Sequence, residues 1–207
     1  MENLNLSKTT LLWLLLSLVS LGNAQESKLL SAFKKSYILE KKGKFKKAAD
    51  VLKQVYDPQS YEINLRLGWL NYEAGLFTES ASHYQRALNL LPYSEEAKFG
   101  LIYPKSAMGK WDEVIEIYKK ILEVHPQNTL ANYRLGLIFY GRKNYEKALK
   151  YFQKLVDLYP FGHDGLIMLA WTNFQLGKYR EAKILFQKAL LYNPDDSSAK
   201  DGLSRIK

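Results

Sequence analysis

Few side chains in this chain have catalytic or metal-binding chemistry, and their spacing does not match that of a known site. The three histidines are His83, His125 and His163, and none has a partner at metal-ligand spacing. The chain has no cysteine, which excludes thiol chemistry and disulfide bonds. The glycine-rich phosphate loop, the G-x-S-x-G nucleophile motif and the H-E-x-x-H zinc motif are all absent from the sequence. The sequence therefore predicts a protein that is not an enzyme and that uses no metal or cofactor.

Two pairs of neighbouring carboxylates, Glu95-Glu96 and Asp195-Asp196, are the remaining candidates for acid–base chemistry. Each pair stands where an apolar helical pattern begins. Acidic side chains stabilise that end of a helix because they face the positive pole of the helix dipole. We interpret both pairs as helix-start residues.

The elements that position these side chains are clearest in residues 163–196, which read as two amphipathic helices. Leu166, Leu169 and Ala170 fall at i, i+3 and i+4, on one face of a 3.6-residue period. Gly177 separates the two helices, because glycine adopts the left-handed conformation that closes a helix at little steric cost.

This helix pair is repeated along the chain. Prolines recur every 34 residues at Pro92, Pro126, Pro160 and Pro194. The repeats in register are residues 29–60, 61–94, 95–128, 129–162 and 163–196. A fixed period of this length indicates a stacked helical array.

Four positions of the repeat carry the packing pattern. Position 7 is Leu67, Leu101, Leu135 and Leu169; position 8 is small in Gly68, Gly136 and Ala170; position 20 is Ala48, Ser80, Ala148 and Ala182; position 24 is Leu52, Tyr84, Tyr118, Phe152 and Phe186. The pattern resembles the tetratricopeptide repeat, W-x2-L-G-x2-Y followed by A-x3-F and P. The resemblance covers nearly all of the chain after residue 28. It implies an all-α fold, a right-handed α-solenoid of antiparallel helix pairs.

The two ends of the array differ from its middle. After Pro194, residues 197–207 show a stripe of Ala199, Leu203 and Ile206 behind capping side chains at Asp195-Asp196, which predicts a short capping helix. In the first repeat the distance from position 20 to the proline is ten residues, against twelve in the second repeat, so we expect a shortened second helix.

Two further departures from the pattern lead to local predictions. Pro104 lies inside the first helix of the third repeat, where it removes a backbone hydrogen bond and predicts a kink. The fourth repeat has Lys143 at the turn position that glycine takes elsewhere. Asn144, beside it, is the next-best residue for a left-handed turn, so we expect the turn to survive.

Residues 1–24 have the three-part form of a secretory signal peptide: a polar start with Lys8, an apolar run over residues 11–21 and small residues before a cleavage site. The alternative is an uncleaved anchor, but eleven core residues fall short of the roughly 20 that span a bilayer. The mature chain, residues 25–207, would be one repeat domain. An exported protein of the bacterial envelope, periplasmic or extracellular, is the interpretation that fits best.

The first repeat is strongly basic. Residues 29–60 with the preceding Lys28 hold nine lysines against Glu40, Asp50 and Asp57, so that nine minus three, or +6, of the formal net charge of +9 lies here. A solvated end of the stack explains this charge. The alternative is a weak contact with an acidic partner or an anionic membrane surface. Nucleic acid is not an expected partner, because no nucleic-acid motif is present.

The resemblance also implies a binding groove. In the family the first helices line the concave face, and positions 2, 5, 9, 12 and 13 point into it. Positions 5, 9 and 12 carry mostly large apolar side chains: Phe33, Tyr37, Leu65, Trp69, Tyr72, Phe99, Tyr103, Tyr133, Leu137, Tyr140, Ile167, Trp171 and Phe174. Glu40 and Ser106 are the exceptions, and Arg66 and Arg134 at position 6 add hydrogen-bond donors for a bound chain. Aromatic rings on a concave surface are favoured anchors for a partner, although such rings also pack between repeats.

Two functional classes follow from the groove. The first is a scaffold that holds an apolar segment of another envelope protein, as the resemblance implies. The second is a platform that stacks a glycan on the same rings, as in a polysaccharide-export accessory. Few acidic or amide side chains occupy positions 5, 9 and 12, which disfavours sugar binding. Self-association through the groove or the seam is a third alternative.

Overall fold

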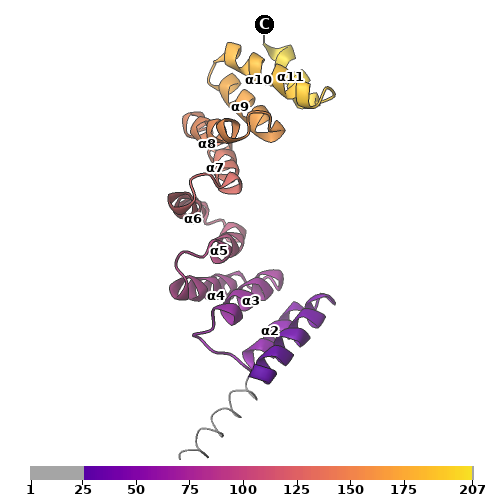
Figure 1. The fold of residues 1–207 in the computed structure, drawn as a ribbon, viewed down its shortest axis with the longest axis vertical. Helices are drawn as coiled ribbons and strands as arrows, with labels where there is room; N and C mark the ends of the chain where they lie inside the picture. The colour runs from indigo at the N-terminus through magenta and orange to yellow at the C-terminus, as the bar shows by residue number, and fades with distance from the viewer. Residues whose placement is uncertain (1–25, 207) are drawn as a thin grey trace, which may run out of the picture. The chain divides into compact units, whose positions relative to one another are not determined.

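The computed structural model describes residues 26–206, and these residues form helices joined by tight turns, with no strand among them (Figure 1). The predicted signal segment, residues 1–24, lies outside this range. The chain divides after Gly109 into two compact units. We call residues 26–109 unit one and residues 110–206 unit two, and describe each by itself.

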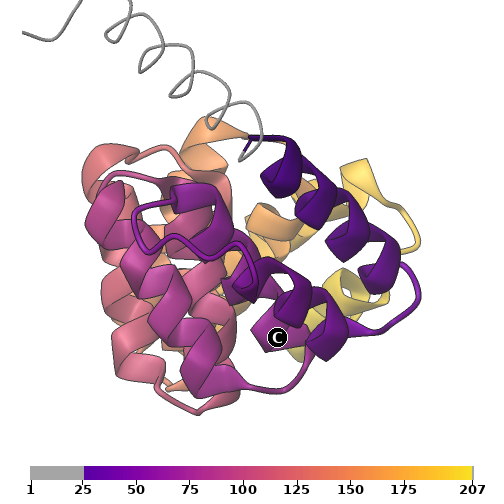
Figure 2. The same cartoon turned by 90° about the horizontal axis from the view of Figure 1, so that it is seen from below.

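Unit one consists of a helix over residues 26–40, which we call the first helix, followed by α2 (Phe45–Lys53), α3 (Tyr61–Glu73), α4 (Phe77–Leu90) and α5 (Glu95–Ala107). The first helix packs against α2 and α3 (Figure 2), with Ala32, Ala48 and Leu67 in one buried cluster. The helix α2 has 9 residues where α4 has 14, which confirms the shortened second helix of the first repeat.

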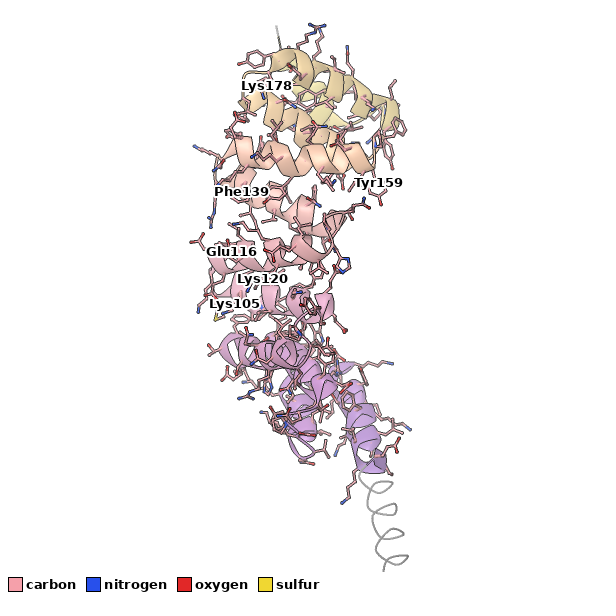
Figure 3. The ribbon with its side chains drawn as sticks, turned by 60° about the vertical axis from the view of Figure 1, so that its left-hand side comes forward. Lys105, Glu116, Lys120, Phe139, Tyr159 and Lys178 are labelled. Carbon is pink, nitrogen blue, oxygen red and sulfur yellow. The ribbon has the colours of Figure 1, made fainter. Side chains whose placement is uncertain are left out.

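Unit two consists of α6 (Trp111–Val124), α7 (Thr129–Gly141), α8 (Tyr145–Leu158), α9 (His163–Gln175), α10 (Tyr179–Tyr192) and α11 (Ser197–Arg205). Figure 3 shows Phe139, near the end of α7, and Tyr159, just after α8, at opposite edges of this unit. This is the arrangement that antiparallel helices require. The all-α, paired-helix fold is confirmed, while the right-handed sense of the superhelix stays a prediction.

Polar side chains begin the first helix of three pairs, α3, α5 and α7, and also the capping helix α11. The residues at these N-caps are Ser60, Ser94, Asn128 and Asp196, whose side chains accept from the backbone N–H three residues later. This bond satisfies one of the free donors at a helix start. Glu95 and Glu96 lie in the first turn of α5, which agrees with their interpretation as helix-start residues.

The turn within each pair uses one backbone conformation. Gly43, Gly75, Gly109 and Gly177 all have φ between +66° and +75°. Lys143 takes the same place with φ +58°, so the turn survives, as expected. The left-handed residue is Lys143 itself and not Asn144. The side chain of Asn144 instead caps α8 by accepting from the Lys147 N–H at 3.3 Å.

Glycines let aromatic rings lie directly on a helix backbone. A Cβ atom on Gly136 would lie 2.5 Å from Phe152, and one on Gly68 would lie 2.8 Å from Tyr84. The ring of Tyr84 also covers Gly100 of the following helix. Small residues at position 8 therefore make room for the large side chain at position 24.

The C-terminal helix α11 covers the end of unit two. Ala199 is fully buried, and Leu203 and Ile206 pack against a cluster that contains Leu166 and Ala170. This confirms the predicted capping helix.

The helix α5 continues through Pro104 to Ala107, and the proline itself is buried. The kink predicted at this residue stays a prediction. Over residues 26–206, no helix combines the length and the apolar character needed to cross a bilayer.

Candidate functional site

A cavity of about 610 Å³ in unit one brings together most of the groove residues predicted for this part of the chain. Most of its lining residues belong to the helix over residues 26–40, to α3 and to α5, each of which begins a helix pair, and Tyr84 of α4 also lies on the wall. The predicted residues on its wall are Phe33, Tyr37, Leu65, Arg66, Trp69, Phe99 and Tyr103. Tyr72 is not on the wall, but its ring centroid lies 5.4 Å from that of Tyr103.

The rings of this cavity pack partly on one another and partly face solvent. The ring centroids of Trp69 and Tyr103 are 6.3 Å apart in an edge-to-face arrangement. Tyr37 keeps 48% of its surface exposed and Tyr103 keeps 49%. Both interpretations of these rings therefore apply, because the same side chains stabilise the stack and leave apolar surface uncovered.

An ion pair joins Arg66, which lines the cavity, to Glu40, which does not. The guanidinium group of Arg66 donates to the carboxylate of Glu40, and the indole N–H of Trp69 donates to the same carboxylate at 2.6 Å. Arg66 also lies over the ring of Tyr37, with 3.9 Å between its guanidinium carbon and the ring centroid. The hydrogen bond from Arg66 is the largest influence on the Glu40 carboxyl and lowers its pKa, against the effect of burial.

This ion pair gives Arg66 and Trp69 hydrogen-bond partners within the protein, while both residues stay on the cavity wall. From the sequence, Arg66 is expected to donate hydrogen bonds to a bound chain, and Glu40 is an exception among the groove positions. The structure shows both polar groups joined within the protein. The detectable signal was the pairing of an acidic side chain at position 12 with a basic one at position 6 of the next repeat.

Two carboxylates on the cavity wall, Glu62 and Glu96, were not among the predicted site residues. Both stand at position 2, which the resemblance had already placed in the groove. Ser60 Oγ donates to Glu62 at 3.0 Å, and the hydroxyl of Tyr61 donates to Glu96 at 3.4 Å. Burial raises the pKa of the Tyr61 phenol above its ordinary value of 10.

The groove residues predicted in unit two have other surroundings. Trp171 donates its indole N–H to Ser198 of α11 at 2.8 Å and packs edge-on against Phe186. It therefore helps to hold the capping helix α11 in place. Ile167 packs against the buried cluster that contains Leu166 and Ala170. The other predicted rings pack on neighbouring rings: Phe174 on Tyr179, Tyr140 on Tyr145 and Tyr133 on Phe152. Arg134 is exposed.

Unit two has a cavity of about 470 Å³ that the sequence did not predict. Its wall includes Tyr133, Tyr159, His163 and Tyr192. Figure 3 shows Tyr159 at the edge of the unit. His163 is joined to Asp196 through Nε2 at 2.9 Å, a contact between the start of α9 and the cap of α11.

His83 in unit one is part of a structural network. Its Nδ1 lies 3.1 Å from Oδ1 of Asn64, which also accepts from the hydroxyl of Tyr56 at 3.0 Å. Burial, together with the positive charges of Arg86 and Lys53, lowers the pKa of His83 to about 4. Over residues 26–206, no group of three His, Cys, Asp or Glu side chains has the geometry of a metal site.

This chain is similar to known repeat proteins in sequence and in structure. Family models described as tetratricopeptide repeat match residues 33–95, 105–163 and 139–206. A crystal structure of a tetratricopeptide repeat protein from Parabacteroides merdae superposes with a TM-score of 0.73 and 20% identity, covering 87% of this chain and 72% of that one. At this identity the likeness shows the fold alone.

Two curated proteins are similar to part of this chain in sequence. The human protein O-mannosyl-transferase TMTC1 is 28% identical over 145 residues, which are 67% of this chain but 16% of that protein. The photosystem I assembly protein Ycf3 of Rippkaea orientalis is 27% identical over 120 residues, or 51% of this chain and 69% of that protein. Repeat proteins of this kind are typically non-enzymatic scaffolds with extended surfaces that bind protein partners. The matched repeats span most of the sequence, and the chain belongs to the tetratricopeptide repeat family.

Proposed function

We propose that this protein is a non-enzymatic scaffold that holds a segment of another protein in the cavity of unit one. The observation that supports this function best is the pair of half-exposed rings, Tyr37 and Tyr103, on the wall of one cavity between successive helix pairs. Tyrosine is a frequent anchor at protein interfaces, because it buries a large ring at a modest loss of conformational entropy.

Burial of these rings supplies the affinity. Apolar area removed from water contributes roughly 25 cal/mol per Å², from which the costs of association are subtracted. A short segment that covers only the exposed faces of two rings therefore binds weakly by itself. Affinity increases when the segment also fills the space beside Leu65 and Phe99.

The polar groups of the cavity fit binding better than catalysis. Arg66 is neutralised by Glu40, and burial raises the pKa of the Tyr61 phenol, which makes it a weaker acid. Glycan stacking, the alternative function, is less well supported, because the indole N–H groups of Trp69 and Trp171 already donate to Glu40 and Ser198. Neither indole N–H is then available for a sugar hydroxyl.

The test is selection from a phage-displayed library of random dodecapeptides on the chain comprising residues 25–207. Peptides selected by the wild-type chain should lose binding to a Tyr37→Ala/Tyr103→Ala variant of unchanged helicity. The matched control is Tyr93→Ala, because Tyr93 is 77% exposed and lies outside the cavity wall. Selected peptides that bind all three chains equally would contradict the proposed site.

Export to the bacterial envelope is part of the same proposal and depends on residues 1–24 alone. Sequencing the N-terminus of the protein purified from its own cells tests it. A start at Gln25 is the expected result, and an intact N-terminal segment in the purified protein would contradict cleavage.

A further inference from the structure

We propose that the cavity of unit one selects a segment with a lysine or arginine side chain placed between apolar residues. This inference rests on the proposed function and names the class of ligand. It comes from the charges and rings that line the cavity rather than from the repeat pattern.

The wall of the cavity is acidic in a chain that is basic. Its charged lining residues are Glu62, Glu96 and Arg66, and Arg66 is paired with Glu40. Three carboxylates minus one guanidinium leave a formal charge of −2 at this site, whereas the whole chain carries +9. A positive ligand group therefore finds here a local field opposite in sign to the net charge of the protein.

The Glu62 and Glu96 carboxylates remain open to a ligand. Both residues are exposed, and each accepts from a hydroxyl group, of Ser60 and Tyr61 respectively. A hydroxyl donor leaves the charge of a carboxylate in place, in contrast to the guanidinium that neutralises Glu40.

The rings supply the second half of a cation site. A cation over an aromatic face is attracted by the negative face of the ring, within about 6 Å of its centroid. Arg66 already makes this contact with Tyr37 at 3.9 Å while its guanidinium pairs with Glu40. The cavity thus contains one internal example of a cation held by a ring and a carboxylate. The half-exposed ring of Tyr103, with Glu62 and Glu96 on the same wall, offers a similar environment to a cation from outside.

Acidic residues at these positions also have a simpler role. Glu62 lies in the first turn of α3 and Glu96 in the first turn of α5, where any carboxylate is favoured by the helix dipole. Glu79 lies in the first turn of α4 but not on the cavity wall. Glu79→Gln is therefore a matched control that removes a helix-start carboxylate without changing the cavity.

The experiment uses three blocked pentapeptides, Ac-Ser-Leu-X-Leu-Ser-NH2, in which X is lysine, norleucine or glutamate. Titration calorimetry measures their binding to the chain of residues 25–207 in 50 mM KCl. We expect the lysine peptide to bind about three- to tenfold more tightly than the norleucine peptide, as two partly exposed charge pairs and one ring contact allow. The glutamate peptide should bind most weakly.

The variants locate the preference. Glu62→Gln/Glu96→Gln should bind the lysine and norleucine peptides equally, while Glu79→Gln should keep the wild-type ratio. Raising KCl to 500 mM should reduce the lysine preference in the wild-type chain, because salt screens exposed charges.

Several results would overturn the inference. Equal or tighter binding of the norleucine peptide by the wild-type chain excludes selection of a cation, and so does a lysine preference that survives in Glu62→Gln/Glu96→Gln. Failure of the lysine peptide to bind also overturns it. The proposed scaffold function fails separately, when library peptides bind the Tyr37→Ala/Tyr103→Ala variant as well as the wild type. Circular dichroism of each variant shows whether it remains folded.

Discussion

The indole N–H of Trp69 donates a hydrogen bond of 2.6 Å to the carboxylate of Glu40, 29 residues earlier in the chain. Because Arg66 donates to the other oxygen of the same carboxylate, Glu40 ties the first helix to α3 through two contacts. The side chains of Arg66 and Glu40 are 10% and 22% exposed. The wall of the candidate binding cavity is therefore held by an ion pair that is largely removed from water.

Removing the charge of Glu40 should destabilise unit one. In Glu40→Gln the buried guanidinium of Arg66 loses its counter-charge, and we expect the free energy of unfolding to fall by about 1–3 kcal/mol. Urea denaturation followed by circular dichroism measures this change. The control is Glu116→Gln, which breaks the exposed Lys119–Glu116 pair and should cost under about 0.5 kcal/mol. Equal effects of the two substitutions would contradict the role given to Glu40.

The lowered pKa of the Glu40 carboxyl also predicts how the free energy of unfolding changes with pH. Its pKa is lower in the folded protein than the ordinary value of 4.5, so the folded state favours the charged form. The stabilisation is present above the unfolded-state pKa and is lost as the pH falls through the folded-state pKa. The difference in stability between wild type and Glu40→Gln should therefore shrink as the pH falls below 4.5, and a difference that stays constant in acid would count against the ion pair.

Two glycines of α7 should respond oppositely to the same substitution. In Gly136→Ala the new Cβ atom meets Phe152 at 2.5 Å, and this ring is fully buried, so we expect a loss of about 1–3 kcal/mol. In Gly141→Ala the new atom meets nothing within 4 Å, and the better helix propensity of alanine should stabilise by about 0.5–1 kcal/mol. Urea denaturation of both variants tests the contact, and a neutral Gly136→Ala would show that the ring can move aside.

The left-handed backbone at Lys143 should carry a measurable cost. Glycine occupies this place in the other four turns, and a side chain in this conformation costs about 1–2 kcal/mol. Lys143→Gly should therefore stabilise the chain by about 0.5–1 kcal/mol after the larger entropy loss of glycine on folding. Lys150→Gly, at an exposed site within α8, should instead destabilise by about 1 kcal/mol. A Lys143→Gly variant less stable than wild type would mean that the lysine side chain makes a contribution of its own.

His83 should make unit one less stable in mild acid. Its pKa falls from 6.5 to about 4 on folding, so between these pH values the unfolded chain takes up a proton that the folded chain does not. Stability therefore falls as the pH falls through this interval, with a slope of at most one proton. In His83→Asn an amide nitrogen replaces Nδ1 beside Asn64, and the variant should lose less stability than wild type between pH 6.5 and pH 4.5. Parallel curves for the two chains would rule out this titration.

The repeat architecture could be predicted from the sequence because each helix pair contacts mainly its neighbours along the chain. The spacing of Pro92, Pro126, Pro160 and Pro194 therefore predicts directly which helix pairs are neighbours in the stack. The glycines at position 8 contact the rings at position 24, as the 34-residue period predicts. The apolar stripe that contains Ala199 and Leu203 predicts the capping helix. The helix starts follow from local chemistry, because Ser60, Asn128 and Asp196 need only the next turn of backbone to act as caps.

The chemistry of the cavity was decided by the tertiary structure. Repeat register places Glu40, Arg66 and Trp69 on neighbouring helices, but it does not say which donor reaches which acceptor across 26 to 29 residues. Those side-chain contacts depend on the distance between helices and on rotamers, which the period does not encode. The same holds at the turn of the fourth pair. Local propensity favours Asn144 for the left-handed site, but the backbone hydrogen bonds of the turn require that conformation one residue earlier, at Lys143.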